Sequence, residues 1–201
     1  MRMLVTAVFA GLLTQAAWTD GISSAYTELR ASRDCTTFDG NNFGQGEFAR
    51  LVCPGYRGYP VLLFASDLRQ SLFYGFPPSD LDRLKLESFG SFNSTGGTIE
   101  WRISTHHGVS TPFAAIHRWY VADSPDSSNQ IEILVVAKVA QPDSTDGCTV
   151  GLVLATGRPD AIEIARGIAD QEARDFVCGQ DKRIVVGGPM PEFDLHDSSA
   201  R

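Results

Sequence analysis

Two short segments carry the side chains best suited to ligand chemistry. Glu100, Trp101 and Arg102 follow one another in the first segment, and Arg118 and Trp119 follow one another in the second. Successive side chains of a strand point to opposite faces, so Glu100 and Arg102 would share one face while Trp101 takes the other. If the two segments pair, a carboxylate, guanidinium groups and an aromatic wall come together, which suits the binding of a carboxylate or a sugar.

The same pattern has a purely structural explanation. Opposite charges on one face of a strand pair, with tryptophans packed on the other face, are routine stabilisers of sheets. We therefore predict these five residues as candidate binding residues, with a structural salt bridge as the alternative. Whether Trp101 and Trp119 lie in the core or on the surface decides between the two.

Histidines offer a second kind of chemistry. His106 and His107 are adjacent in an expected turn and His117 lies in the following segment, so two of the three could approach a metal ion. Adjacent histidines in a loop are more often solvated, and no carboxylate stands at a recognised metal-binding spacing from them. We predict no catalytic residue and no cofactor, because the usual serine-nucleophile, zinc-protease and phosphate-loop motifs are missing from the sequence.

The stretch from residue 130 to residue 179 gives the clearest indications of secondary structure. It predicts strands over residues 131–140 and 148–155, separated by a polar turn, and then a helix over residues 160–176. In the helix, apolar residues recur at steps of three and four and form one stripe. Charged residues fill the other face, which is typical of a solvated surface.

Upstream residues predict further strands joined by short polar turns. Residues rich in Val, Leu, Ile, Phe and Tyr indicate these strands at 47–52, 59–65, 70–74, 98–104 and 113–122. Residues 39–46, rich in Gly and Asn, are expected to form a loop, and residues 183–186 an edge strand. Successive strands followed by a single long helix predict the α+β class, as an antiparallel meander with one long C-terminal helix packed on it.

The four cysteines predict two disulfides, because an even number is typical of exported proteins. Three pairings are possible among Cys35, Cys53, Cys148 and Cys178. About eight strand residues after Cys148 cover about 26 Å, and a helix of about seventeen residues returns the same distance. Cys178 would then lie beside Cys148, which leaves Cys35 to pair with Cys53, its neighbour in sequence.

The N-terminal segment predicts export. Residues 1–16 combine a basic residue, an apolar run and a small-residue ending, which is the pattern of a secretory signal peptide. The run of about ten residues is too short for the roughly twenty of a spanning helix, so we predict no stable membrane insertion. Cleavage is expected after Ala16, with Ala17 and Ala25 as alternatives.

The remaining chain is long enough for one globular domain, expected over residues 17–186. Residues 187–201, rich in Gly, Pro, Asp and Ser, are expected to form a flexible tail. Removing residues 1–16 takes away one Arg and no acidic residue, so the formal net charge changes from −7 to −8. With no run of clustered Lys or Arg, nucleic acid is not a predicted partner.

Several short segments form a recognisable set. They are Cys53-Pro-Gly-Tyr-Arg-Gly-Tyr-Pro-Val, Ile99-Glu-Trp-Arg, Pro112-Phe-Ala with Arg118-Trp119, and Ala165-Arg166 with Ile168-Ala-Asp. Over most of residues 26–178, the chain resembles a group of small secreted alphaproteobacterial proteins of unknown function. The resemblance implies a bacterial periplasmic setting. It implies no activity for this chain, because no activity is known for that group.

Two functions from different classes follow. The first is a periplasmic or secreted, non-catalytic binding or accessory module that acts through a protein partner in the cell envelope. It would use the cluster at Glu100 to Arg102 and Arg118 to Trp119, or the Gly/Asn loop inside Cys35 to Cys53. The alternative is a small metal-dependent or hydrolytic enzyme built on His106, His107 and His117. We favour the first, because no catalytic constellation is recognisable; the oligomeric state stays open.

Overall fold

The computed structural model shows a protein built mainly of β-strands, described over residues 21–196 except 46, 82–83, 85 and 125–127. Strands account for 51% of the described residues and helical residues for 12%, and only one helix among them has seven residues or more. The predicted α+β class is therefore wrong: the protein is a mostly β structure with one helix of substantial length.

The larger sheet has six strands in the order β1-β7-β8-β9-β10-β11. All neighbours are antiparallel except β11, which runs parallel to β10 because the chain crosses over through a helix between them. The bounds are β1 Gly21–Glu28, β7 Asn93–His106, β8 Val109–Ala122, β9 Gln130–Lys138, β10 Thr149–Leu154 and β11 Ile184–Val186. The consecutive strands β7 to β10 form an antiparallel meander, but the strands predicted upstream of residue 75 belong to a separate sheet.

A second sheet has four antiparallel strands in the order β2-β3-β4-β5. They are β2 Thr36–Gly40, β3 Phe48–Cys53, β4 Val61–Ser66 and β5 Arg69–Tyr74. A two-stranded ribbon pairs β6 Leu86–Phe89 with β12 Phe193–His196. The helical elements are α1 Ala31–Asp34, the 3₁₀ turn η1 Tyr56–Gly58, and α2 Ala161–Glu172.

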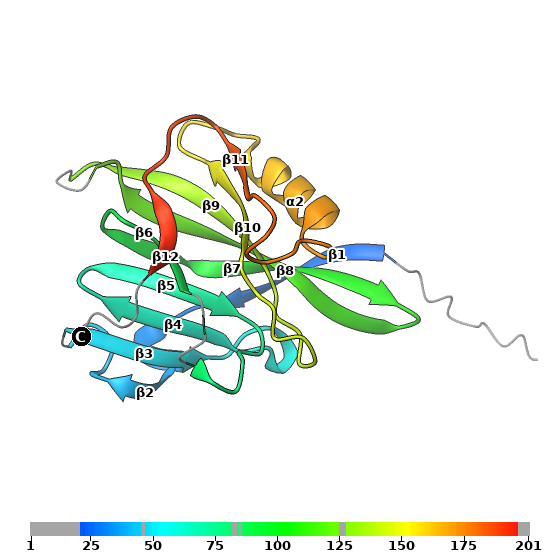
Figure 1. Cartoon of the computed structure of the whole chain (residues 1–201), viewed down its shortest axis with the longest axis horizontal. Helices are drawn as coiled ribbons and strands as arrows, with labels where there is room; N and C mark the ends of the chain where they lie inside the picture. The colour runs from blue at the N-terminus through cyan, green and yellow to red at the C-terminus, as the bar shows by residue number, and fades with distance from the viewer. Residues whose placement is uncertain (1–20, 46, 82–83, 85, 125–127, 197–201) are drawn as a thin grey trace, which may run out of the picture.

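These elements stack in three layers, with α2 on one face of the six-stranded sheet and the four-stranded sheet on the other (Figure 1). Alternation along β7 and β8 separates the two interfaces. Ile99, Trp101 and Ile103 of β7 pack toward the four-stranded sheet, whereas Ala114 and Ile116 of β8 pack toward the helix. A third cluster joins the six-stranded sheet to the β6–β12 ribbon.

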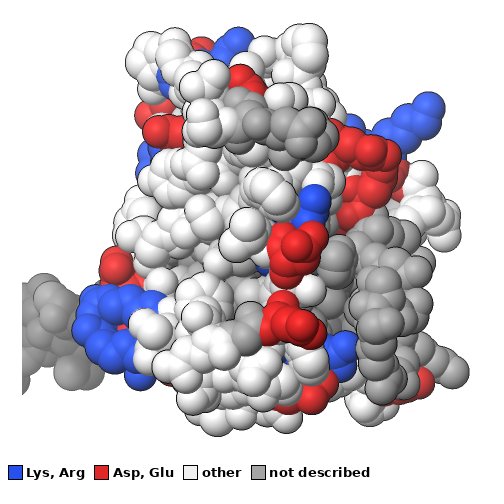
Figure 2. All heavy atoms as spheres, turned by 90° about the vertical axis from the view of Figure 1, so that its left-hand side faces the viewer, with Lys and Arg blue, Asp and Glu red and all other residues white. Residues whose placement is uncertain are grey.

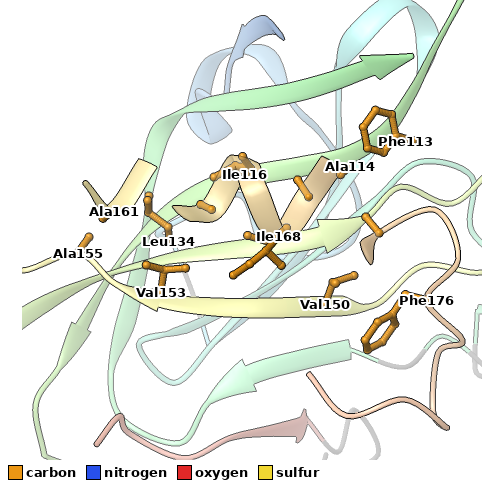
Figure 3. Close-up of a cluster of buried hydrophobic side chains, with 14 residues drawn as sticks. Phe113, Ala114, Ile116, Leu134, Val150, Val153, Ala155, Ala161, Ile168 and Phe176 are labelled. Atoms are coloured by element: carbon orange, nitrogen blue, oxygen red, sulfur yellow. The ribbon is translucent and has the colours of Figure 1, made fainter. Parts of the chain in front are cut away.

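The apolar stripe of α2 behaves as its spacing predicts. Ala161, Ala165, Ile168 and Ala169 are all buried against the sheet (Figure 3). Small side chains allow a close approach, and a Cβ added at Gly151 of β10 would lie only 2.9 Å from Ile168 Cγ2. The helix is shorter than the predicted 160–176, because the chain continues after it through hydrogen-bonded turns rather than further helix.

Both predicted disulfides are confirmed. Cys35 and Cys53 are joined with Cα atoms 4.2 Å apart, and Cys148 and Cys178 with Cα atoms 5.8 Å apart. The second bond ties the segment after α2 to the start of β10, which is the return geometry expected from the lengths of strand and helix. Disulfides of this kind are typical of proteins outside the reducing cytosol.

Four strands explain why the fold class differs from the prediction. β1 overlaps residues 25–33, which the sequence leaves open between a short helix and a short strand, and β2 runs into the loop expected over residues 39–46. β6 has only four residues. β12 occupies part of the segment expected to be a flexible tail, and its Phe193 is buried against Phe89 with ring centroids 4.6 Å apart. These strands form through pairing with distant neighbours, so no local period predicts them.

The predicted signal peptide, residues 1–16, lies outside the described residues, as do the cleavage positions Ala16 and Ala17. Ala25, the third cleavage position, lies inside β1 opposite Trp101. Cleavage after Ala25 would remove residues 21–25, more than half of this ordered eight-residue strand. Within the part of the chain that the structure describes, no helix is both long and apolar enough to cross a bilayer.

Candidate functional site

Both tryptophans of the predicted binding cluster are buried in the core. Trp101 packs edge-on against Tyr74 with ring centroids 6.1 Å apart, and its Nε1 donates to Thr27 Oγ1 at 2.8 Å. Trp119 packs against Phe89 at a centroid distance of 5.6 Å in the interface with the β6–β12 ribbon. Neither ring offers an aromatic wall to a ligand.

The charged members Glu100 and Arg102 lie on the opposite face of β7, beneath α2. Glu100 is buried and accepts two hydrogen bonds from Arg166, at 2.8 Å from Nε and 3.1 Å from Nη2. Arg102 makes a second fork, with Nε and Nη2 donating to Asp170 at 2.8 and 2.6 Å. Ser24 Oγ bridges the two by donating to Glu100 and accepting from Arg102. We call Ser24, Glu100, Arg102, Arg166 and Asp170 the ion cluster.

The predicted meeting of this cluster with Arg118 does not occur. The register places Ile116 opposite Glu100 and Ala114 opposite Arg102, while Arg118 pairs with Glu132 on β9. The charged groups of the ion cluster are thus engaged within the chain, and Arg166 Nη2 also donates to the Tyr26 hydroxyl at 3.1 Å. The hydrogen bonds from Arg166 to Glu100 raise the pKa of the guanidinium further, which reinforces the pair. This geometry favours the structural alternative: the cluster fastens α2 to the sheet.

The three histidines do not converge. His117 is fully buried, with Nδ1 2.9 Å from the Tyr74 hydroxyl and Nε2 2.6 Å from the Gly96 carbonyl oxygen. Desolvation lowers its pKa to about 4, against a smaller opposing effect of the hydrogen bond to Gly96. Nε2–H therefore donates to the Gly96 carbonyl oxygen, and Nδ1 of the neutral ring accepts a hydrogen bond from the Tyr74 hydroxyl.

His106 and His107 lie at the far end of the same hairpin. His117 pairs with Ile99, whereas His106 pairs with Val109, seven residues further along β7, which is about 23 Å of strand. Among the described residues, no group of three or more His, Cys, Asp and Glu side chains is arranged to hold a metal ion. The histidine constellation predicted as an alternative is therefore not assembled.

A different site lies where the two sheets part at one end of the sandwich. A pocket of about 380 Å³ opens there between the start of β7 and the hairpin β4–β5, and we call it the sandwich mouth. It is lined by Phe43, Gly44, Glu47, Phe48, Ala49, Ala65, Ser66, Asp67, Leu68, Arg69, Gln70, Phe92, Asn93, Ser94 and Gln130. Phe43 and Gly44 come from the Gly/Asn loop that the sequence singles out as a possible binding element.

Large apolar side chains stand exposed around the sandwich mouth. Phe48, Leu68 and Phe92 are 42%, 73% and 39% exposed, and Leu68 is the most exposed large apolar side chain of the described residues. Figure 2 views the molecule from the side that carries the β4–β5 turn, where uncharged atoms form much of the surface and acidic and basic groups are interspersed. An apolar rim around a concave opening is typical of an interaction site.

Leu68 is held in an unusual backbone conformation. The two central residues of the β4–β5 turn, Asp67 and Leu68, have φ of 47° and 60°. The β7–β8 turn has the same length, with His107 at 48° and Gly108 at 80°, and uses glycine where this turn has leucine. Positive φ favours Gly, Asn or Asp at these positions, so leucine is the costly choice.

Neighbouring groups fix this strained turn. Arg69 Nη1 donates to the Asp67 carbonyl oxygen at 3.0 Å, its Nε donates to Gly90 O at 2.8 Å, and its guanidinium lies 5.0 Å from the centroid of the Phe92 ring. The Asn93 N–H donates to the Leu68 carbonyl oxygen at 3.1 Å. The surrounding structure therefore dictates the conformation, which is how strain persists at functional positions.

The floor of the sandwich mouth is also rigid. The buried Asn93 accepts from the Gln70 N–H at 2.9 Å through Oδ1 and donates to Ser91 O at 3.1 Å through Nδ2. Gln70 Oε1 in turn accepts from the Thr95 N–H at 2.9 Å. These hydrogen bonds of the Asn93 and Gln70 side-chain amides hold β5 against the start of β7. The rim can therefore present its apolar side chains without having to order itself on binding.

A second pocket of about 370 Å³ lies beside the Cys148–Cys178 disulfide. Its principal charged groups are already engaged: Glu87 accepts from Arg183 Nη2 at 2.6 Å and from the Thr149 N–H at 2.6 Å. Asp146 pairs with Lys138 at 3.3 Å. Its rim lacks the strongly exposed apolar side chains of the sandwich mouth, so we regard the mouth as the better candidate.

The chain matches no protein-family model, no curated protein and no solved structure.

Proposed function

We propose that this protein is a non-catalytic binding module that engages a protein partner in the cell envelope through the sandwich mouth. The observation that carries this proposal is the exposed Leu68, held at positive φ on the rim of a preformed pocket. Packing within the chain does not explain a leucine side chain that stands in water at positive φ, so its role is sought in contacts made with another molecule.

The composition of the rim supports a protein partner over a small polar ligand. Phe48 and Phe92 flank Leu68, and Arg69 stacks on Phe92. Aromatic residues and arginine are enriched at the centres of protein interfaces, where apolar anchors insert into pockets of the partner. Because Arg69 is already paired with Asp67, the rim presents mainly apolar contact area.

The proposed setting is the periplasm or the extracellular medium. Two disulfides support an oxidising compartment. The leader-like residues 1–16 and the resemblance to small secreted proteins point the same way. No observation favours the enzyme alternative, since the buried His117 has both ring nitrogens engaged.

Site-specific photocrosslinking in the exporting cell tests the proposal. A photoreactive amino acid replaces Leu68 in one variant and Val109 in a matched control. Val109 is an apolar residue 67% exposed at the turn that lies at the other end of β8. We expect one discrete crosslinked species from position 68 and none of that mass from position 109.

The crosslinked partner is then identified and purified, and its affinity for the protein is measured. Leu68→Asp should weaken binding by at least tenfold, because it places a charge in the centre of an apolar contact. Val109→Asp should leave the affinity unchanged. Equal crosslinking from both positions, or a partner whose affinity ignores Leu68→Asp, contradicts the assignment of the sandwich mouth.

A further inference from the structure

The free edges of the sheets differ in how they are protected. Exposed edge strands tend to pair with other chains, and proteins blunt them with short length, bulges, charges or covering side chains. β11 has only three residues, and β2 carries a bulge and the charged Asp39. At the edge of β5, Asn93 accepts from the Gln70 N–H and Ser88 Oγ donates to the Gln70 carbonyl oxygen. Each of these three edges is therefore blunted.

β1 has none of these protections. It is an eight-residue edge strand in unbroken register with β7, and within the described residues β7 is its only strand partner. Its sequence, Gly-Ile-Ser-Ser-Ala-Tyr-Thr-Glu, has neither proline nor lysine and a single charge at its last residue. Ile22 and Tyr26 are 39% and 57% exposed. This edge is open for strand addition.

The hydrogen-bonding pattern shows which backbone groups face outward. Leu29 donates its N–H to Gly97 O directly after the β1–β7 register, so this pair is a hydrogen-bonded one. Because such pairs alternate along an antiparallel ladder, the N–H and C=O groups of Ile22, Ser24 and Tyr26 point away from β7. These are also the residues whose side chains lie on the α2 face, where Ser24 contacts Glu100.

We propose that β1 pairs antiparallel with β1 of a second copy of this chain, on a twofold axis at Ser24. This register brings each Ile22 opposite the partner's Tyr26. The two side chains lie on the same face of the joined sheet, and the outward-facing N–H and C=O groups of both residues meet across the axis. The exposed apolar side chains of β1 then cover each other as β-branched and aromatic cross-strand pairs, made twice by symmetry. The edge is self-complementary, and the two six-stranded sheets join into one.

The oligomeric state of the purified protein that begins at Ala17 tests this assignment. Light scattering and sedimentation velocity across a concentration series should show a dimer. Ile22→Lys places a charge opposite Tyr26 twice in the interface and should raise the dimer dissociation constant about tenfold or more. The control is Val185→Lys, a β-branched residue 53% exposed on β11 at the opposite edge of the same sheet, which should remain dimeric.

Amide hydrogen exchange provides the second measurement. Ile22, Ser24 and Tyr26 should exchange slowly in the dimer and rapidly in Ile22→Lys, while the amides of β8 stay protected in both and so show that the variant is folded. A wild-type chain that remains monomeric throughout the series overturns the proposal. So does a dimer that Ile22→Lys leaves intact, or one that Val185→Lys dissociates.

Discussion

The ion cluster beneath α2 and the sandwich mouth use their unusual residues in opposite ways. In the cluster, Glu100 is buried, Arg102 is half-buried, and both meet partners within the chain. At the mouth, Phe48 and Leu68 are exposed although both are apolar. Polar groups that satisfy one another hold the fold together, whereas the apolar groups left in water are the ones available to the proposed partner. The two regions can therefore be separated by experiments that measure stability and binding in parallel.

Removing the central carboxylate of the ion cluster should have the largest effect on stability. Glu100→Ala leaves Arg166 without its bidentate acceptor, while Arg102 keeps its fork to Asp170. We expect the free energy of unfolding to fall by about 3 kcal/mol, the lower end for a broken buried pair, because the Arg166 side chain is partly exposed. Urea denaturation followed by tryptophan fluorescence measures this change.

The conservative variant sharpens the same comparison. Glu100→Gln keeps the volume and one acceptor, so it should lose less stability than Glu100→Ala. Both variants, once folded, should retain full affinity for the partner captured at the sandwich mouth. A loss of affinity larger than the loss of folded protein would mean that the ion cluster takes part in recognition.

Acid should destabilise the core through His117. Its pKa in the folded protein is about 4, against 6.5 for the free side chain, so the unfolded chain binds more protons between these values. Stability is therefore present in full above pH 6.5 and falls as the pH drops toward 4, by about 3 kcal/mol in total.

The variant His117→Gln isolates this contribution from carboxylates that titrate in the same range. Urea midpoints measured at several pH values should show a shallower slope between pH 6.5 and 4 in His117→Gln than in the wild type. Identical slopes would mean that protonation of His117 is compensated within the fold.

Substitution at the strained turn should give the smallest stability change, with the opposite sign. Leu68→Gly removes a side chain from a position with φ of 60°, and the relief outweighs the greater freedom of glycine in the unfolded chain. We expect about 1 kcal/mol of added stability by thermal unfolding, together with weaker partner binding. Gly108→Ala, at the equivalent position of the β7–β8 turn, should instead destabilise by about 1 kcal/mol. A Leu68→Gly variant that binds the partner with normal affinity would show that binding needs neither the Leu68 side chain nor the backbone strain.

The parts of the fold that the sequence predicts are those with a strong local signal. The apolar stripe of α2 recurs at steps of three and four, and β8 and β9 are long runs of consecutive buried residues. The strand and helix lengths suffice to pair Cys148 with Cys178. β2 and β12 are short, and their pairing depends on β3 and β6. Pairing with a distant strand leaves no local trace, and so the β content was underestimated.

The candidate site was predictable only in part. Alternation along β7 correctly separates Glu100 and Arg102 from Trp101, but whether a strand faces water or a second sheet is a tertiary property. The Gly/Asn loop was singled out, and it does line the sandwich mouth. The sequence around Asp67 and Leu68 does not indicate a two-residue turn, because the usual signal is glycine at the second position and this turn has leucine there.

The Cys35–Cys53 bond joins the chain where β2 begins to the point where β3 ends. The hairpin is thus closed covalently at its base, while its loop, with Phe43 and Gly44, reaches the sandwich mouth at the other end. Doubling the length of such a loop costs only about 0.6 kcal/mol of closure entropy. Descendants of this chain could therefore exchange or lengthen the loop and acquire new partners by mutation while inheriting the same scaffold.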